Sequence, residues 1–367
     1  MKLSVLCLAL VIGSCLLLST PVFADHGDPA FLDRFHTLTT VASTVPASGD
    51  VNPYGIAVVP VTRGALVEKS VLITNFNNSS NLQGTGTTIV EISPSGALTL
   101  FANIDAGSLP GPCPGGVGLT TALVALRSGF VVAGSLPTTD GTAATAQAGC
   151  LIVLNSKGQP VMTLAGNGIN GPWDMTALDF DSISVLFVSN VLNGTVAGGG
   201  TVVPKGTVLR IVLFTPASGT PQELGRTIIG SGFQEKTDPA ALVIGPTGLA
   251  LGFAGQLFVA DTVQNRIAAI PNALFRRDDA KTGFTVSAGK ALNGPLGLAV
   301  APDGHILSVN SGDGNIVETE TDGEQVAVKT IDVSQQGAGT LFGLTLAPGG
   351  RGVYFVDDGN NTLDLLH

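Results

Sequence analysis

A short pattern recurs along this chain and constrains its fold more than any other feature. Its clearest copies are G-P-T-G-L-A-L-G-F-A-G-Q-L-F-V-A-D-T-V-Q-N-R-I-A-A-I from Gly245 and G-P-L-G-L-A-V-A-P-D-G-H-I-L-S-V-N-S-G-D-G-N-I-V-E-T from Gly294. Each copy holds three apolar runs separated by turns rich in Gly, Asn and Asp, which is typical of antiparallel strands. Such repetition indicates a fold built from copies of one supersecondary unit.

Four further copies complete the series. N-P-Y-G-I-A-V-V-P begins at Asn52 and L-F-G-L-T-L-A-P at Leu341, and looser copies begin near Leu119 and Gly171. We therefore expect six units, starting near residues 52, 119, 171, 245, 294 and 341. Long helical periodicity is absent after the N-terminal segment, so the predicted fold class is all-β.

The repeated pattern resembles the NHL repeat, in which P-x-G-L-A-V and a turn precede L-Y-V-A-D and R-I. The match is closest over residues 245–270 and extends over nearly the whole chain after the N-terminal segment. The resemblance implies a six-bladed β-propeller with four-stranded blades. It implies no definite activity, because this fold hosts both binding proteins and enzymes.

The ends of the chain predict how the ring closes. The last copy supplies only three strands before His367, whereas F-L-D-R-F-H-T-L-T-T-V-A at residues 31–42 belongs to no copy. We expect residues 31–42 to form the missing outer strand, since closure removes an exposed sheet edge. Residues 25–367 would then form one propeller domain.

The first 24 residues have the pattern of a secretory signal peptide. Lys2 precedes an apolar run, and Val22-Phe23-Ala24 gives a small-residue cleavage site. We expect cleavage after Ala24, a secreted or periplasmic protein, and no membrane span in the mature chain. A net charge of −10 argues against nucleic acid as a partner.

Two cysteines remain once the signal peptide is removed. Cys113 and Cys150 are an even pair in an exported chain, so they predict a disulfide.

In a propeller of this kind, the connections between the second and third strands emerge on one face. Three of them are long, at residues 75–88, 134–149 and 190–206, and rich in Gly, Thr, Asn and Ser. They mark a working surface or have lengthened neutrally in solvent.

Polar residues end the second strand of five units, at positions that the repeat makes equivalent. They are Asn75, Asn190, Asp261, Asn310 and Asp357. A ring of oxygen ligands would suit calcium. Asn and Asp side chains also hold tight turns by bonding to nearby backbone amides, and this structural role is favoured because the residue recurs where the turn is minimal.

Calcium-dependent lactonases of the gluconolactonase and regucalcin type share the expected architecture. The resemblance implies acidic and amide ligands just before each innermost strand, close to the axis. The corresponding residues here are Tyr54, Trp173, Thr247, Leu296 and Phe342, none of them a carboxylate or carboxamide. Asn52 and Asp174 lie one or two positions away, so a carried-over lactonase centre is disfavoured.

Three hypotheses follow. The first is a binding or interaction module that uses the face with the three insertions, takes a small molecule or an extracytoplasmic protein, needs no cofactor and acts as a monomer. Its ligand would contact Tyr54, Trp173, Asp174, Leu296 and Phe342 at the channel mouth, unless these side chains plug the channel. The second is a metal-dependent hydrolase or lyase with calcium on Asn52, Asp174 and Asn190. The third is a cell-surface structural protein. Because no catalytic constellation stands out, the first is preferred.

Overall fold

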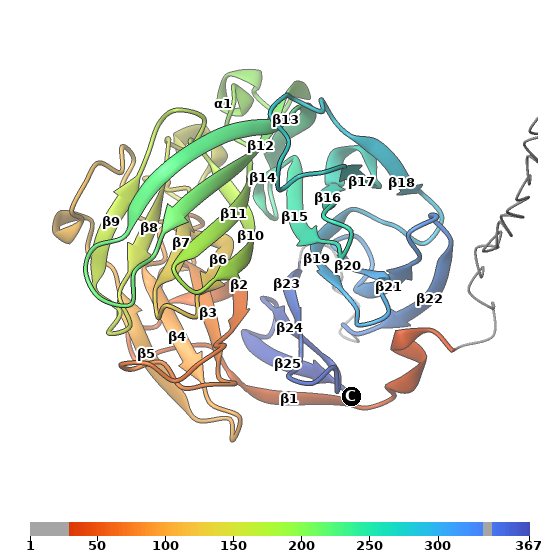
Figure 1. The fold of residues 1–367 in the computed structure, drawn as a ribbon, viewed down its shortest axis with the longest axis horizontal. Helices are drawn as coiled ribbons and strands as arrows, with labels where there is room; N and C mark the ends of the chain where they lie inside the picture. Colours follow the sequence, from red (N-terminus) through yellow and green to blue (C-terminus); the bar gives the residue numbers. More distant parts are fainter. Residues whose placement is uncertain (1–28, 333–339) are drawn as a thin grey trace, which may run out of the picture.

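Six antiparallel sheets surround a central axis in the computed structural model, which describes residues 29–332 and 340–367 (Figure 1). This arrangement confirms the predicted six-bladed β-propeller. The predicted signal peptide, residues 1–24, and its cleavage point after Ala24 lie outside the described residues. The described part of the chain contains no helix whose length and apolar character would let it cross a membrane.

The two inner strands of each blade flank the axis. The innermost strands are β2 (Val51–Val58), β6 (Leu119–Ala125), β10 (Pro172–Phe180), β15 (Pro246–Leu251), β19 (Pro295–Val300) and β23 (Leu341–Leu346). The second strands are β3 (Val71–Asn77), β7 (Val131–Ser135), β11 (Ile183–Asn190), β16 (Leu257–Asp261), β20 (Ile306–Asn310) and β24 (Val353–Asp357). Every innermost strand begins within one residue of the start expected from the repeat.

The two outer strands of each blade complete the sheets. The third strands are β4 (Thr88–Ile92), β8 (Cys150–Leu154), β12 (Val203–Phe214), β17 (Arg266–Ile270), β21 (Asn315–Thr319) and β25 (Thr362–Leu366). The outer strands are β5 (Leu98–Asn103), β9 (Pro160–Leu164), β13 (Gln222–Asp238), β18 (Phe284–Ala288), β22 (Gln325–Thr330) and β1 (Leu38–Ser43).

Packing between blades explains the apolar runs in the repeat. The second strands β3, β16 and β20 are buried along their whole length, because both faces of each blade pack against neighbouring blades. Strands covered on both faces have continuous rather than alternating apolar sequences. A bulge near the start of the innermost strands, between Pro246 and Leu249 in β15, sets the register of the Pro-x-Gly segment.

The N-terminal segment closes the ring as predicted. Strand β1 pairs with β25, Leu38 opposite Leu366, and lies beside the C-terminus (Figure 1). The predicted strand at residues 31–42 starts too early, however. Its first residues form the 3-10 helix η1 (Phe31–Arg34), because the buried Glu318 carboxylate accepts hydrogen bonds from the backbone N–H groups of Phe31 and Leu32, at 2.8 and 2.7 Å.

The third blade departs from the four-stranded plan. Its sheet carries a fifth strand, β14 (Leu242–Ile244), which pairs with the end of the long β13 in a hairpin. The predicted insertion at residues 190–206 is only partly a loop, since it contains the short α1 (Thr195–Gly198) and the start of β12. The other short helices are η2 (Ala106–Ser108), η3 (Ala143–Thr145) and η4 (Thr262–Gln264).

Candidate functional site

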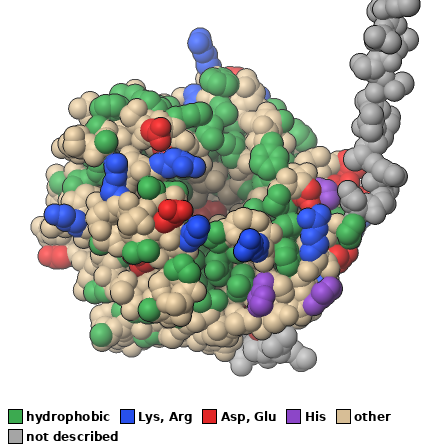
Figure 2. Space-filling model, turned by 60° about the horizontal axis from the view of Figure 1, so that its bottom comes forward, with side chains coloured by type: hydrophobic (Ala, Val, Ile, Leu, Met, Phe, Trp, Pro, Cys, Tyr) green, Lys and Arg blue, Asp and Glu red, His purple; other side chains and the backbone are tan. Residues whose placement is uncertain are grey.

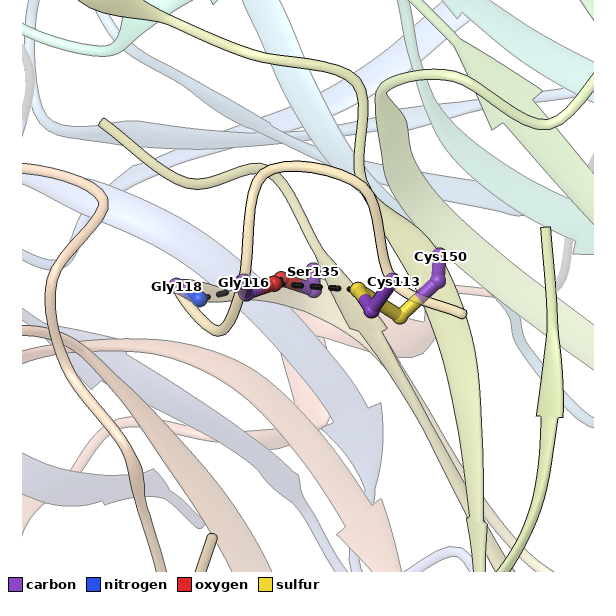
Figure 3. Close-up of a disulfide and its surroundings, with 5 residues drawn as sticks. All are labelled: Cys113, Gly116, Gly118, Ser135 and Cys150. Atoms are coloured by element: carbon purple, nitrogen blue, oxygen red, sulfur yellow. Dashed lines mark hydrogen bonds between the residues drawn. A yellow bond between two sulfur atoms is a disulfide. The ribbon is translucent and has the colours of Figure 1, made fainter. Parts of the chain in front are cut away.

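The predicted disulfide between Cys113 and Cys150 is present and braces the insertion face. It ties the connection before β6 to the end of the second insertion (Figure 3). Beside it, Ser135 at the end of β7 donates a hydrogen bond to the carbonyl of Gly116 and accepts one from the N–H of Gly118, each at 3.0 Å. These contacts fix the connection to its blade.

An aromatic cluster closes the axis below this face. Tyr54 stacks on Phe342, with ring centroids 3.7 Å apart, and on Phe76 at 4.4 Å, and Trp173 lies 6.2 Å from Phe342. Tyr54 and Trp173 are only 2% and 3% exposed, and Leu296 and Phe342 are fully buried. A void of about 10 Å³ lies among these rings, enough for roughly one water molecule. We call Tyr54, Phe76, Trp173, Leu296 and Phe342 the aromatic plug.

A hairpin that sequence reasoning missed covers the plug. Strands β13 and β14 place residues 238–243 over the rings, where the Trp173 indole N–H donates to the carbonyl of Val243 at 3.0 Å. The Tyr54 hydroxyl donates to the carbonyl of Ala240 at 3.4 Å. The first insertion braces the hairpin, since the Gln83 side chain donates to the carbonyl of Pro239. Tyr54, Trp173, Leu296 and Phe342 therefore lie together, and of the two alternatives that the sequence leaves open they form the plug.

Asp174, the fifth residue expected at the channel mouth, lines a separate space on the other side of the plug. A cavity of about 650 Å³ runs along the axis, between the innermost strands. Its lining extends from Asp174 to Phe253 in the turn between β15 and β16, so it opens on the face opposite the insertions. The Phe253 side chain is 76% exposed at this mouth. We call this space the axial channel; its inner end is blind because the plug closes it.

Most of the side chains that line the axial channel are apolar, and threonine and aspartate side chains add polar groups. Most of the apolar ones are Ala, Val, Leu and Ile from all six innermost strands, and the described ionisable side chains of the lining are Asp174 and Asp179. Asp179, at the outer end of β10, accepts hydrogen bonds from the N–H of Arg127 and the hydroxyl of Ser184. Asp174 is thus the one ionisable group at the blind end among the described residues. The face drawn in Figure 2 is hollowed near its centre and carries both hydrophobic and cationic side chains.

The electrostatics at the blind end single out Asp174. One carboxylate oxygen accepts the N–H of Leu249 from the neighbouring blade, at 2.8 Å. Burial raises the pKa of this carboxyl to about 7, although backbone hydrogen bonds oppose the rise. Thr121 of β6 also lines the channel, and its buried hydroxyl has no hydrogen-bond partner among the described residues. Sequence reasoning missed Thr121, because it lies in the loosest copy of the repeat.

The polar residues at the ends of the second strands hold turns and connections. Asn75 donates to the carbonyl of Thr44, Asn310 donates to the carbonyl of Ala291, and Asp261 forms an ion pair with Arg266 at 2.8 Å. Asn190 accepts the N–H of Asn170, and Asp357 accepts the N–H of Asn360. Of these contacts, only the one at Asp357 is the predicted bond to a nearby backbone amide; the ion pair of Asp261 spans its own turn, and the others join connections that lie farther along the chain. The Oδ1 atoms of Asn75, Asp261 and Asn310 have no partner among the described residues.

The residues near the axis do not fit a calcium ion. Calcium takes six to eight oxygen ligands. Apart from threonine hydroxyls, the residues that line the channel with Asp174 at its blind end are mainly glycine and aliphatic, and an oxygen of Asn190 is occupied by the N–H of Asn170. No contact in the described part of the chain joins Asn52, Asp174 and Asn190. Among the residues described, the one compact group of three His, Asp or Glu side chains is Asp303, His305 and Glu318.

That second group serves the N-terminus. Both Glu318 oxygens accept backbone N–H groups of η1, and Nδ1 of His305 lies 2.6 Å from one of them. The carboxylate is therefore already satisfied by hydrogen bonds, so this group is not a good metal site.

A smaller pocket of about 280 Å³ lies on the insertion face. It is formed between the first two insertions and the β13–β14 hairpin, and Gln83, Thr142, Asp238 and Leu242 are among its lining residues. Two of the three insertions thus build a concave surface together with the hairpin.

No protein-family model and no curated protein matches this sequence. Solved structures do resemble it. A gluconolactonase from Xanthomonas campestris has a TM-score of 0.55 at 13% identity, over 90% of this chain and 88% of that chain. A luciferin-regenerating enzyme has a TM-score of 0.55 at 11% identity, covering 90% and 94%. A PQQ-bound aldose sugar dehydrogenase from Streptomyces coelicolor has a TM-score of 0.52 at 16% identity, covering 90% and 97%.

At these identities the likeness shows the fold alone. The neighbours are named for three different reactions, so the propeller does not choose among them. PQQ carries carboxylates that call for cationic partners, whereas the described lining of the axial channel has no Lys, Arg or His. Neither calcium nor PQQ fits the residues present, and we derive no chemistry through either group.

Proposed function

We propose that this chain is an extracytoplasmic binding protein that takes a small, mainly apolar molecule into the axial channel. The observation that carries the proposal is the channel itself: about 650 Å³, lined chiefly by aliphatic side chains and closed at one end by the plug. Ligand pockets commonly have this size and an apolar lining with few polar groups. An exposed Phe253 at the mouth suits an apolar ligand as well.

We also propose a secreted or periplasmic location and an NHL-type repeat for this chain. A disulfide in a small-residue-rich β-protein is typical of oxidising compartments, which supports secretion or a periplasmic location. The Pro-x-Gly starts of the innermost strands support an NHL-type repeat.

The insertion face is a second candidate surface, for an extracytoplasmic protein partner. Its pocket between Gln83, Thr142 and Asp238 supports this role. The lactonase-like alternative has weaker support, since the axial residues lack a set of oxygen ligands. Metal analysis of the purified protein distinguishes it, because a stoichiometric divalent ion would favour a metal-dependent enzyme.

The channel proposal is tested with N-phenyl-1-naphthylamine, a neutral apolar fluorophore that brightens when it leaves water. We expect saturable binding to the mature chain, and loss of that binding in Thr345→Trp, because Thr345 lines the channel on β23 and a tryptophan there would fill it. Leu224→Trp, on the exposed surface of β13, is the matched control and should bind as the parent does. Equal binding by both variants would refute the channel as the site.

A further inference from the structure

The innermost strands share a position where side chains are generally excluded. It is the residue directly after the plug position of the repeat, and it is glycine in four blades: Gly55, Gly248, Gly297 and Gly343. A Cβ at any of these glycines would lie closer than 3.0 Å to backbone of the next blade. Packing of adjacent blades therefore forbids a side chain there.

The third blade breaks this rule with a polar residue, and the second blade carries a polar residue beside the same position. G-P-W-D puts Asp174 at the glycine position of the third blade, directly before Met175. The bulge of β6 holds one more residue, so Ala122 directly precedes Leu123 as glycine precedes Leu249, and Thr121 lies one residue earlier. Asp174 uses the close approach of the next blade, since its carboxylate accepts the N–H of Leu249. One polar side chain thus replaces glycine and a second lies beside that position, on adjacent blades that both line the channel.

Both groups have hydrogen-bonding capacity that the described residues do not use. Thr121 is 4% exposed and lies between the axial channel and the small void among the plug rings, and its buried hydroxyl oxygen has no partner among the described residues. Asp174 is 8% exposed and, within the described lining, has no cationic neighbour to neutralise it. A buried carboxylate without a counter-ion is costly, and a cation that enters the channel would remove that cost.

We propose that the ligand is an aliphatic or aromatic primary amine whose ammonium group lies against the Asp174 carboxylate and the Thr121 hydroxyl, with its apolar body along the channel. This inference rests on the proposed function and specifies its ligand class. An ammonium group has three donors, which match these acceptors. The net charge of −10 favours the approach of a cation.

Cyclohexylmethylamine and its neutral analogue cyclohexylmethanol test the inference by calorimetric titration of the mature chain. We expect the amine to bind at least about tenfold more tightly than the alcohol, as a charge-assisted hydrogen bond provides. In Asp174→Asn the amine should lose about tenfold in affinity and the alcohol should keep its affinity. Because Asn can still accept the Leu249 N–H, we expect the variant to fold, which its melting temperature checks. Asp181→Asn, an exposed turn residue that loses the same charge, is the control.

Thr121→Val provides an independent variant that leaves Asp174 in place. It removes the hydroxyl at constant shape and should weaken amine binding by about threefold to tenfold. If amine and alcohol bind equally and Asp174→Asn changes neither, the amine inference fails while the channel proposal stands. If neither probe nor N-phenyl-1-naphthylamine binds, both fail.

Discussion

At the residue scale, the glycines of the innermost strands are fixed by the approach of neighbouring blades. A Cβ on Gly297 would meet the carbonyl oxygen of Phe342 and a methyl group of Leu344. We expect Gly297→Ala to lower the free energy of unfolding by about 2 kcal/mol or more, because the ring must expand to admit it. Gly225→Ala, on β13 with open space around it, is the control for urea denaturation. Equal stability of the two variants would contradict this packing.

The fluorescence of Trp173 can show whether the plug is closed to solvent. It is the only tryptophan, it is 3% exposed, and its indole is bonded to the hairpin. We expect acrylamide to quench its fluorescence far less in the folded protein than in urea. Quenching as strong as that of the unfolded chain would mean that the mouth on the insertion face is open.

At the element scale, local sequence predicts the blades well and the closure of the channel poorly. The repeat specifies strands and turns within short segments, so the innermost strands begin where the pattern predicts. Tyr54 and Trp173 could either line an open ligand pocket or fill the channel, and the same side chains suit both arrangements. The sequence alone therefore does not distinguish a pocket from a plug. The choice depends on contacts between Trp173 and Val243, 70 residues apart. The repeat shows Asp174 where four other copies have glycine, but it does not show the contact of Asp174 with Leu249, 75 residues away.

The N-terminal element closes the ring through η1 and β1. Deletion of residues 25–45 should cause global unfolding or aggregation, because it removes an outer strand and the buried Phe31 and Leu32. An unchanged melting temperature would contradict the closure.

Glu318→Gln should lower the free energy of unfolding by about 1 to 3 kcal/mol, since a neutral amide accepts the N–H groups of η1 less strongly. Glu324→Gln, on an exposed turn, is its control.

At the scale of the whole molecule, burial of several carboxyls links stability to pH. Burial raises the pKa of Asp174 and of Glu235 to about 7, and that of Asp358 to about 8, where the nearby Asp357 and Asp332 add to the rise. In the unfolded chain these groups titrate near the usual values of 3.8 for Asp and 4.5 for Glu. Between these limits the folded protein holds more protons than the unfolded chain.

The stability contributed by the protonated groups is therefore present at low pH and is lost as pH rises toward 8. Each raised carboxyl lowers the free energy of unfolding by at most about 1.4 kcal/mol per pH unit in this range. We expect urea denaturation to show falling stability from pH 5 to 8, and Asp358→Asn to make that fall shallower because one titrating group is gone. Asp322→Asn, on an exposed turn, should leave it unchanged. A parallel pH profile for Asp358→Asn and the parent would show that Asp358 is charged throughout, and the insertion face would then carry one more negative charge beside Tyr54.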